Sequence, residues 1–246
     1  RLIPVKIGLN RIVEEVLLKD VRVALSTENV GNLFAPVRVA EDEFHKIFDA
    51  YSLRSEALFG AYRNIIRRLY EGASEEDIER LFIKHTLMQM IVSSCLTVSS
   101  GKTTTPVRAC SGEEIAAEIV LPYLKWWQIL LSSQKMSESD RDFLVSLAES
   151  IYSRTLLLDW RSGGKEDIFR ELYEILIDEG TRRRIGEYYT PLWLAEYITE
   201  KIERDAEGLK GKIVLDPFCG SGTFLVSAFY QKISEGEEAE NDIKEL

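Results

Sequence analysis

The chain has 246 residues with 45% apolar and 29% charged side chains, a composition typical of a soluble globular protein with one large domain or two smaller ones. The formal net charge of −10 argues against DNA binding by the whole surface, although a local basic patch stays open. The sequence shows no signal peptide and no apolar run of transmembrane length, so we expect a cytoplasmic protein without a membrane partner.

Residues 1–40 contain an alternating apolar and polar run at residues 21–25 (VRVAL). Alternation with a period of two favours short β-strands in this part. The pattern then changes to that of helices. Apolar residues recur at helical spacing over residues 53–71, and residues 74–77 (SEED) predict a capping box for a helix that runs toward Leu96.

The middle of the chain is predicted to contain a loop and further helices. Residues 97–110 are rich in serine, threonine and glycine, which makes them the best loop candidate. A second capping box at residues 111–114 (SGEE) predicts a helix that Pro122 interrupts. Further helices are expected over residues 140–158 and 166–177.

A helix start and an apolar helix face are both present in residues 182–198 (RRRIGEYYTPLWLAEYI). Thr190 is a candidate N-cap, and Pro191 is expected at the first helical position, where its missing N–H costs nothing. The apolar residues that follow recur near a period of 3.6, so one face of this helix can pack against a strand. We expect the helix to end near Gly208 or Gly211.

The most informative segment is residues 211–224 (GKIVLDPFCGSGTF). Its apolar run at residues 213–215 predicts a parallel strand that is buried on both faces and ends at Asp216, and ligands bind at strand ends of this kind. The turn at residues 220–222 (GSG) does not complete a dinucleotide fingerprint, because the third glycine is replaced by Leu225. An acidic strand tip followed by glycines suits S-adenosylmethionine, which carries an ammonium group and no phosphate.

Together, residues 186–191 (GEYYTP) and 214–226 (VLDPFCGSGTFLV) resemble the amino-methyltransferases of restriction-modification systems, particularly the N6-adenine DNA methyltransferases of type I and fused type II systems. In that family the two segments are called motif X and motif I, and they form the S-adenosylmethionine pocket. The resemblance implies that the cofactor-binding residues are Tyr189, Thr190, Pro191, Asp216, Pro217, Phe218, Cys219, Gly220, Gly222 and Thr223.

By position in the motifs, Tyr189, Thr190 and Pro191 line the methionine end of the cofactor, and residues 216–222 form the turn beneath it. Family members also place helices before motif X, and residues 164–185 resemble that lead-in. The resemblance is close over the last third of the chain and faint before it.

The catalytic motif of that family is absent from the chain. The motif is Asp or Asn followed by Pro-Pro and an aromatic residue, and it holds the flipped adenine. No Pro-Pro occurs in the sequence, and the tail after Tyr230 is polar and mostly acidic. We therefore assign no catalytic residue, expect an N-terminal part of a longer protein, and expect the chain alone to be inactive.

Other site types are disfavoured. Cys95, Cys110 and Cys219 lie far apart without C-x-x-C spacing, and only two histidines could join them, so neither a disulfide framework nor a metal site is predicted. Cys219 is interpreted as an inert small residue of the turn. Residues 101–103 (GKT) resemble the end of a P-loop but lack its first glycine, and the Glu-x-Lys pattern of metal-dependent nucleases does not occur.

The expected fold is a mainly α-helical N-terminal region followed by the start of a Rossmann-like α/β methyltransferase domain. Residues 1–40 stand apart with short strands, residues 41–185 form the helical domain, and residues 186–246 begin the S-adenosylmethionine-dependent domain. The resemblance implies methylation of adenine N6 in DNA, with DNA and a specificity or partner subunit bound by the full-length protein. Two alternatives stay open: a non-catalytic helical interaction module with a degenerate methyltransferase segment, and a methyltransferase of RNA or of a small molecule.

Overall fold

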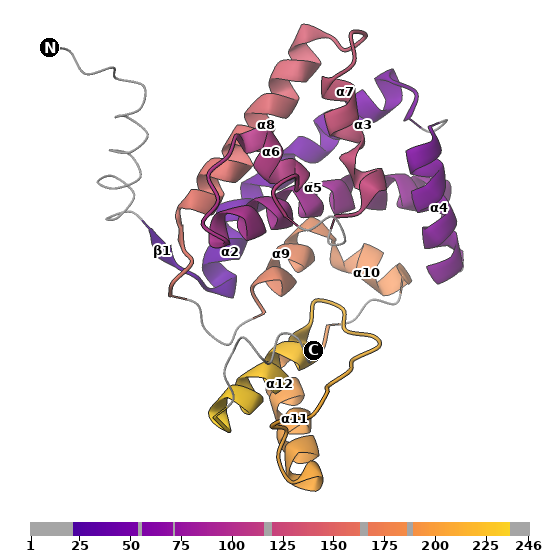
Figure 1. Cartoon of the computed structure of the whole chain (residues 1–246). Helices are drawn as coiled ribbons and strands as arrows, with labels where there is room; N and C mark the ends of the chain where they lie inside the picture. The colour runs from indigo at the N-terminus through magenta and orange to yellow at the C-terminus, as the bar shows by residue number, and fades with distance from the viewer. Residues whose placement is uncertain are drawn as a thin grey trace, which may run out of the picture.

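The computed structural model of the chain describes residues 22–53, 56–70, 72–115, 120–162, 167–185 and 189–236. This part of the protein is mainly helical, as the sequence predicts for its N-terminal region. Figure 1 shows a large helical body and, below it, a smaller pair of helices, α11 (Leu192–Ala206) and α12 (Thr223–Ser234).

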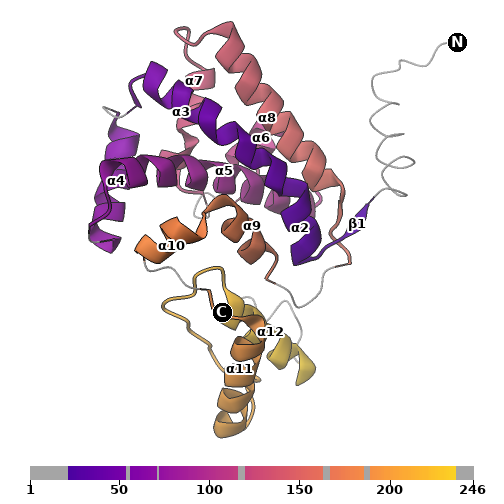
Figure 2. The ribbon, with the colours of Figure 1, turned by 180° about the vertical axis from the view of Figure 1, so that it is seen from behind.

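The helical body consists of shorter helices arranged around one long helix, with two short strands at one side. Its elements are β1 (Val23–Ala24), α2 (Thr27–Phe34), the 3₁₀ helix η2 (Ala35–Ala40), α3 (Glu41–Ala50), α4 (Ala57–Leu69), α5 (Glu75–Ser99), α6 (Pro106–Ser111), the 3₁₀ helix η5 (Pro122–Lys125), α7 (Trp126–Leu131), α8 (Glu138–Leu156), β2 (Leu158–Asp159), α9 (Ile168–Leu176) and α10 (Glu179–Ile185). In Figure 1 and in the reverse view of Figure 2, α9 and α10 lie between the rest of this body and the α11–α12 pair.

Helix α5 is the central helix of the body. It begins with the predicted capping box, in which the Ser74 hydroxyl accepts a hydrogen bond from the Asp77 N–H at 3.1 Å. Among the described helices, α5 alone is long and apolar enough to cross a membrane, which the sequence pattern did not lead us to expect. However, 67% of the apolar stretch of α5 is buried inside the protein. The core helices of soluble proteins can be equally long and equally apolar. Its apolar character is therefore accounted for by the core.

Aromatic side chains fill the contact between α3, α4, α5 and α7. The ring centroid of Phe48 lies 5.1 Å from that of Phe59 and 5.9 Å from that of Phe82. Phe82 also stacks on Trp126 with a centroid distance of 6.0 Å. Such pairs contribute about 0.5–1.5 kcal/mol each beyond the burial of their area. The helical body thus has an extensive apolar core of its own.

The middle of the chain is more helical than predicted. Helices α5 and α6 take up both ends of the predicted loop at residues 97–110, so only residues 100–105 connect helices. Pro122 begins η5 instead of interrupting a helix. Residues 116–119 lie outside the described part.

The predicted second capping box at residues 111–114 is wrong. Ser111 is the last residue of α6, and Gly112 follows it in the left-handed conformation with φ 73°. A side chain there would also be crowded, because a Cβ at Gly112 would lie 2.5 Å from a methyl carbon of Val120. A left-handed glycine directly after the last turn of a helix is a common helix end, and here it ends α6.

Residues 1–40 contain less strand than predicted. Within the described part, β1 is a two-residue strand that pairs in parallel with β2. The Ser26 hydroxyl then caps α2, and residues 27–40 are helical. The expectation of two strands is therefore wrong for this part, because a local N-cap starts a helix directly after β1. Residues 1–21 lie outside the described part.

The strand predicted at residues 213–215 does not form. Residues 212–216 have no regular structure, and Ile213 and Leu215 are 82% and 79% exposed. The described strands, β1 and β2, pair with each other, so this run has no strand beside it to complete a hydrogen-bonded ladder. An apolar β-branched pattern predicts a buried strand only where such a neighbour is available.

The α11–α12 pair is held together at the start of its connecting segment. Pro191 is the N-cap of α11, so the helix begins at Leu192, one position later than predicted, and the Thr190 side chain does not cap it. The predicted end is confirmed, since Gly208 follows the last turn with φ 95°. There the Glu235 carboxylate at the end of α12 accepts hydrogen bonds from the N–H groups of Leu209 and Lys210 at 2.8–3.0 Å, and these bonds lower its pKa.

One face of α11 has no partner in the described part. Trp193 and Tyr197, four residues apart, are both more than half exposed on it, and Ile202 farther along the helix is 52% exposed as well. This surface adds to the exposed run at residues 213–215. The smaller unit therefore buries much less of its apolar surface than the helical body does.

Candidate functional site

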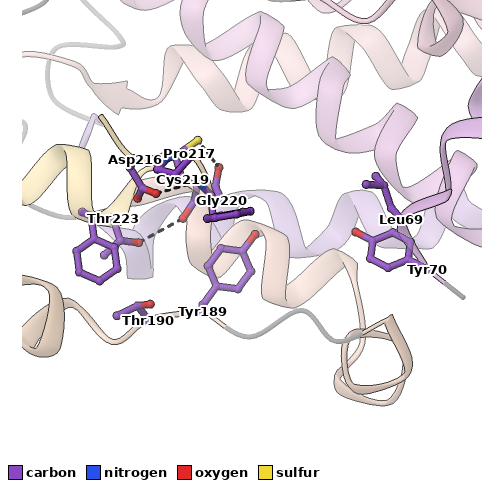
Figure 3. Close-up of a pocket in the computed structure, with 12 residues that line it drawn as sticks. Leu69, Tyr70, Tyr189, Thr190, Asp216, Pro217, Cys219, Gly220 and Thr223 are labelled. Atoms are coloured by element: carbon purple, nitrogen blue, oxygen red, sulfur yellow. Dashed lines mark hydrogen bonds between the residues drawn. The ribbon is translucent and has the colours of Figure 1, made fainter. Parts of the chain in front are cut away.

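A cavity of about 750 Å³ lies between the two sequence motifs and the end of α4 (Figure 3). Its lining residues come from three separate parts of the chain. They are Leu69, Tyr70, Tyr189, Thr190, Asp216, Pro217, Phe218, Cys219, Gly220, Ser221, Thr223 and Phe224. Every residue predicted to bind the cofactor is among them except Pro191 and Gly222, which are the N-caps of α11 and α12.

The floor of the cavity is the glycine turn at residues 216–222. The Asp216 carboxylate accepts a hydrogen bond from the Phe218 N–H at 2.9 Å, and the Gly222 N–H donates to the Cys219 carbonyl at 2.7 Å. Gly220 and Gly222 have φ values of 55° and 94°. A Cβ at either glycine would meet no atom within 4 Å, so the backbone conformation, and not crowding within the chain, favours glycine here.

Tyr189 connects the cavity to the core of the helical body. Its ring centroid lies 5.1 Å from that of Tyr173 on α9, which in turn lies 6.5 Å from the ring of His85 on α5. The His85 Nδ1 is 2.8 Å from the hydroxyl oxygen of Tyr62. Burial lowers the pKa of His85 to about 4, so its ring is neutral at pH 7. This row of rings fixes Tyr189 against a rigid part of the protein.

Leu69 and Tyr70 form a further wall of the cavity, at the end of α4 (Figure 3). No sequence pattern indicated them, because they are far from both motifs along the chain and belong to an ordinary amphipathic helix. Only the packing of the helical body brings them to the site. Ser221 and Phe224 were not assigned either, although they lie within motif I.

The cavity is acidic. Among the described residues that line it, Asp216 is the one charged residue, and no lysine or arginine is found there. Its carboxylate and the hydroxyl and carbonyl oxygens of the turn are hydrogen-bond acceptors. This lining is suited to a ligand with a positive charge or with several donor groups, and unsuited to a phosphate.

Asp167 holds the glycine turn from outside the cavity. It is the N-cap of α9 and is only 7% exposed. Its Oδ2 accepts hydrogen bonds from the hydroxyls of Thr223, at 2.8 Å, and Ser221. The type of residue and its place before a helix signal an N-cap, but no pattern in the sequence indicates the contact with the turn.

The cysteines differ strongly in exposure. Cys95 and Cys110 are buried without a disulfide, and burial raises the pKa of Cys95 to about 12 and that of Cys110 further still. Cys219 is exposed in the turn. Within the described residues, no group of three or more potential metal ligands is found.

Arg182 and Arg183, which precede motif X, are engaged with the protein itself. Arg182 donates to the Ile177 carbonyl at 3.1 Å and lies 3.8 Å from the Glu174 carboxylate. Arg183 pairs with Glu179. The guanidinium groups of Arg182 and Arg183 are thus each paired with a glutamate of the protein.

Comparison with known proteins gives matches to one class of enzyme. The family model described as N-6 DNA Methylase matches residues 164–245, the part that carries both motifs. A type I restriction enzyme EcoEI methylase subunit from Escherichia coli is 29% identical over 85 residues, which cover 34% of this chain and 16% of that protein. A type I restriction enzyme MjaIX methylase subunit from Methanocaldococcus jannaschii is 36% identical over 92 residues, which cover 35% of this chain and 15% of that protein. No solved structure matches the chain.

These matches confirm the resemblance that the motifs indicate, and the family match runs over the last third of the chain. The chain spans only 15–16% of the length of these curated relatives.

Proposed function

We propose that the chain is part of an S-adenosylmethionine-dependent DNA methyltransferase that modifies adenine N6 in a restriction-modification system. Residues 41–185 form its helical domain, residues 22–40 pack into the core of that domain, and residues 186–246 begin a Rossmann-like cofactor domain. The partners of the full-length protein are DNA and a specificity or partner subunit, and its location is the cytoplasm. The names of the relatives, type I restriction enzyme methylase subunits, support this proposal.

One observation carries the assignment of the cofactor site. Tyr189 and Thr190 of motif X line the same cavity as Asp216 and the glycine turn of motif I. Helix α11 and its connecting segment separate these residues along the chain, so their meeting depends on the fold and not on proximity in sequence. Two motifs of one family at one cavity support a single binding site.

The chemistry of the lining fits the cofactor. S-adenosylmethionine carries an ammonium and a sulfonium group and no phosphate, and the cavity offers the Asp216 carboxylate without a basic side chain. The open space above Gly220 leaves room for a ligand to approach the backbone. In this site Asp216 accepts hydrogen bonds from donor groups of the ligand, the turn supports it, and Tyr189 limits its movement. Bound S-adenosylmethionine supplies the methyl group.

The Rossmann-like part of the proposal rests on the position of residues 213–215. This apolar run directly precedes Asp216, the arrangement of a strand that presents an acidic residue at its carboxyl end. Its apolar side chains are exposed, as expected of a strand segment whose neighbouring strands are not among the described elements. Transfer also requires the target amine to be placed in line with the methyl group, and no base-binding motif is present in this sequence.

Calorimetric titration of the full-length natural protein with S-adenosylmethionine tests the site. Asp216→Ala removes a charge-assisted acceptor and is expected to weaken binding by about 1.5–3 kcal/mol. Gly222→Val forces a β-branched residue into the left-handed conformation and is expected to distort the turn and weaken binding as well.

Asp205→Ala, which removes an exposed carboxylate at the far end of α11, is the matched control and is expected to leave binding unchanged. Unchanged affinity in both site variants would overturn the site. Absence of binding in the natural protein would overturn the proposed cofactor.

A further inference from the structure

Asp167 is a buried carboxylate that serves two helix starts at once. Its Oδ1 accepts a hydrogen bond from the Arg170 N–H at 3.2 Å and caps α9. Its Oδ2 accepts the hydroxyls of Ser221 and Thr223, at the start of α12. Helix α12 has Gly222 as its N-cap and therefore no capping side chain of its own. A negative charge near both N-termini is favourable, because the partial charge of each is positive.

The direction of these hydrogen bonds determines what the hydroxyls can offer to a ligand. A carboxylate can only accept, so Ser221 and Thr223 donate their protons to Asp167. Ser221 lines the cavity, and its hydroxyl oxygen keeps its lone pairs as an acceptor. The turn therefore offers hydrogen-bond acceptors to a ligand, as the Asp216 carboxylate also does.

We propose that Asp167 is a positioning residue of the cofactor site: it anchors the glycine turn to α9 and orients Ser221 to accept a hydrogen bond from the ammonium group of the ligand. This inference rests on the proposed function, and it adds a residue outside both motifs to the site. It also makes α9, a helix packed on the helical body, a support for the turn.

The decisive variant is Asp167→Asn in the full-length protein. The amide oxygen of the new side chain can keep the cap of α9, while its NH₂ group faces the two hydroxyls and donates to them. The hydroxyls must then accept from this NH₂ group and turn their protons elsewhere. This variant thus reverses the polarity of the turn while it retains the helix cap. Ser137→Ala is the control for a lost cap, since the Ser137 hydroxyl caps α8 by accepting from the Asp140 N–H at 3.1 Å, within the helical body.

Two ligands separate positioning from a general structural role. S-adenosylmethionine contains the ammonium group, and 5′-methylthioadenosine lacks the whole amino-acid part. We expect Asp167→Asn to weaken binding of S-adenosylmethionine about tenfold or more and that of 5′-methylthioadenosine less than about twofold. Ser137→Ala is expected to change neither. An equal loss for both ligands, or no loss for either, would overturn the inference.

Hydrogen exchange measured without ligand distinguishes a failure of the proposed role of Asp167 from a failure of the proposed function. We expect the amides of residues 218–223 to exchange several times faster in Asp167→Asn than in the natural protein, and those of α8 to be unchanged. Unchanged exchange in the turn would overturn the anchoring role, whatever the cofactor. If the natural protein fails to bind S-adenosylmethionine, the proposed function and the ligand half of the inference fall together, and exchange alone decides the anchor.

Discussion

The helical body and the α11–α12 unit differ in how much of their apolar side-chain surface they bury. The body encloses Phe48, Phe59, Phe82 and Trp126 in one core, whereas the smaller unit exposes Phe218 by 91%, together with the run at residues 213–215 and one face of α11. Burial of apolar surface is the dominant favourable term in folding. The body can therefore be stable by itself, and the smaller unit depends on contacts beyond its own two helices. The candidate cofactor site is lined by residues of both, from the end of α4 and from the two motifs (Figure 3).

The largest expected effect concerns activity. Because the base-binding motif is absent from the sequence, we expect the isolated 246-residue chain to transfer no methyl groups to DNA. The measurement is transfer from labelled S-adenosylmethionine to mixed genomic DNA, with the full-length protein as the positive control. Transfer above background by the chain alone would show that the smaller unit needs no further partner.

Hydrogen exchange compares the two regions directly. We expect the central amides of α5 to exchange at least about a thousandfold more slowly than those of residues 213–215, since α5 is buried and the other segment has no ladder. Mass spectrometry of the chain as a proven monomer measures both. Strong protection of residues 213–215 would mean that the segment pairs in solution, and the contrast between the two regions would not hold.

Substitutions in the two regions compare how much a buried and an exposed apolar side chain contribute to the free energy of unfolding. Phe82→Ala is expected to lower the free energy of unfolding of the helical body by about 3–5 kcal/mol, because it removes a fully buried ring. Leu215→Ala serves as the control and is expected to change it by less than about 0.5 kcal/mol, because this side chain is exposed. Urea denaturation of the chain measures both. Similar losses in the two variants would place Leu215 inside a core.

The smallest expected effect is a pH dependence at the edge of the body. Burial alone would raise the pKa of Asp178, but hydrogen bonds from the Thr181 N–H, from Lys84 and from the Thr181 hydroxyl outweigh it and hold the pKa well below its usual 3.8. A lowered pKa in the folded state means that this contribution to stability is present above pH 4 and is lost as the pH falls below it. We expect about 1 kcal/mol, reduced by solvent screening because the carboxylate is 44% exposed.

Asp178→Asn removes this titrating group, so the unfolding free energy of the variant should fall less steeply between pH 5 and pH 2, as followed by urea titrations at each pH. A slope equal to that of the natural chain would show that other carboxylates dominate. Lys84, buried on α5 and paired with Asp178 at 3.0 Å, loses its nearest partner in this variant, so a lower stability at pH 7 is also expected.

The sequence predicted those features that depend on residues close together in the chain. The capping box at Ser74, the helix over residues 140–158 and the turn between Asp216 and Thr223 are all local, and the structure contains each of them. Gly112 shows the limit of such patterns, because serine, glycine and two glutamates fit a helix start or a helix end equally well. The left-handed conformation at Gly112 decides between them.

Other features depend on what the chain brings together from a distance. A strand at residues 213–215 requires a neighbouring strand, and its own pattern carries no information on whether one is present. Leu69, Tyr70 and Asp167 reach the cavity or its turn through the packing of α4 and α9, which no motif encodes. Within the two motifs the lining of the cavity was predicted except for Ser221 and Phe224, and it was missed where the helical body contributes.

The uneven burial of the tryptophans gives the protein two optical signals. Trp193 on α11 is 68% exposed, whereas Trp126 and Trp127 lie deep in the core. A water-exposed indole emits at longer wavelength than a buried one and is reached by a soluble quencher such as acrylamide. The most quenchable, most red-shifted part of the emission therefore belongs to the helix that follows motif X, and the helical body supplies the blue-shifted part from Trp126 and Trp127 and an intermediate part from the partly buried Trp160. Any partner that covers α11 will change the first signal and leave the second, without a label having to be attached.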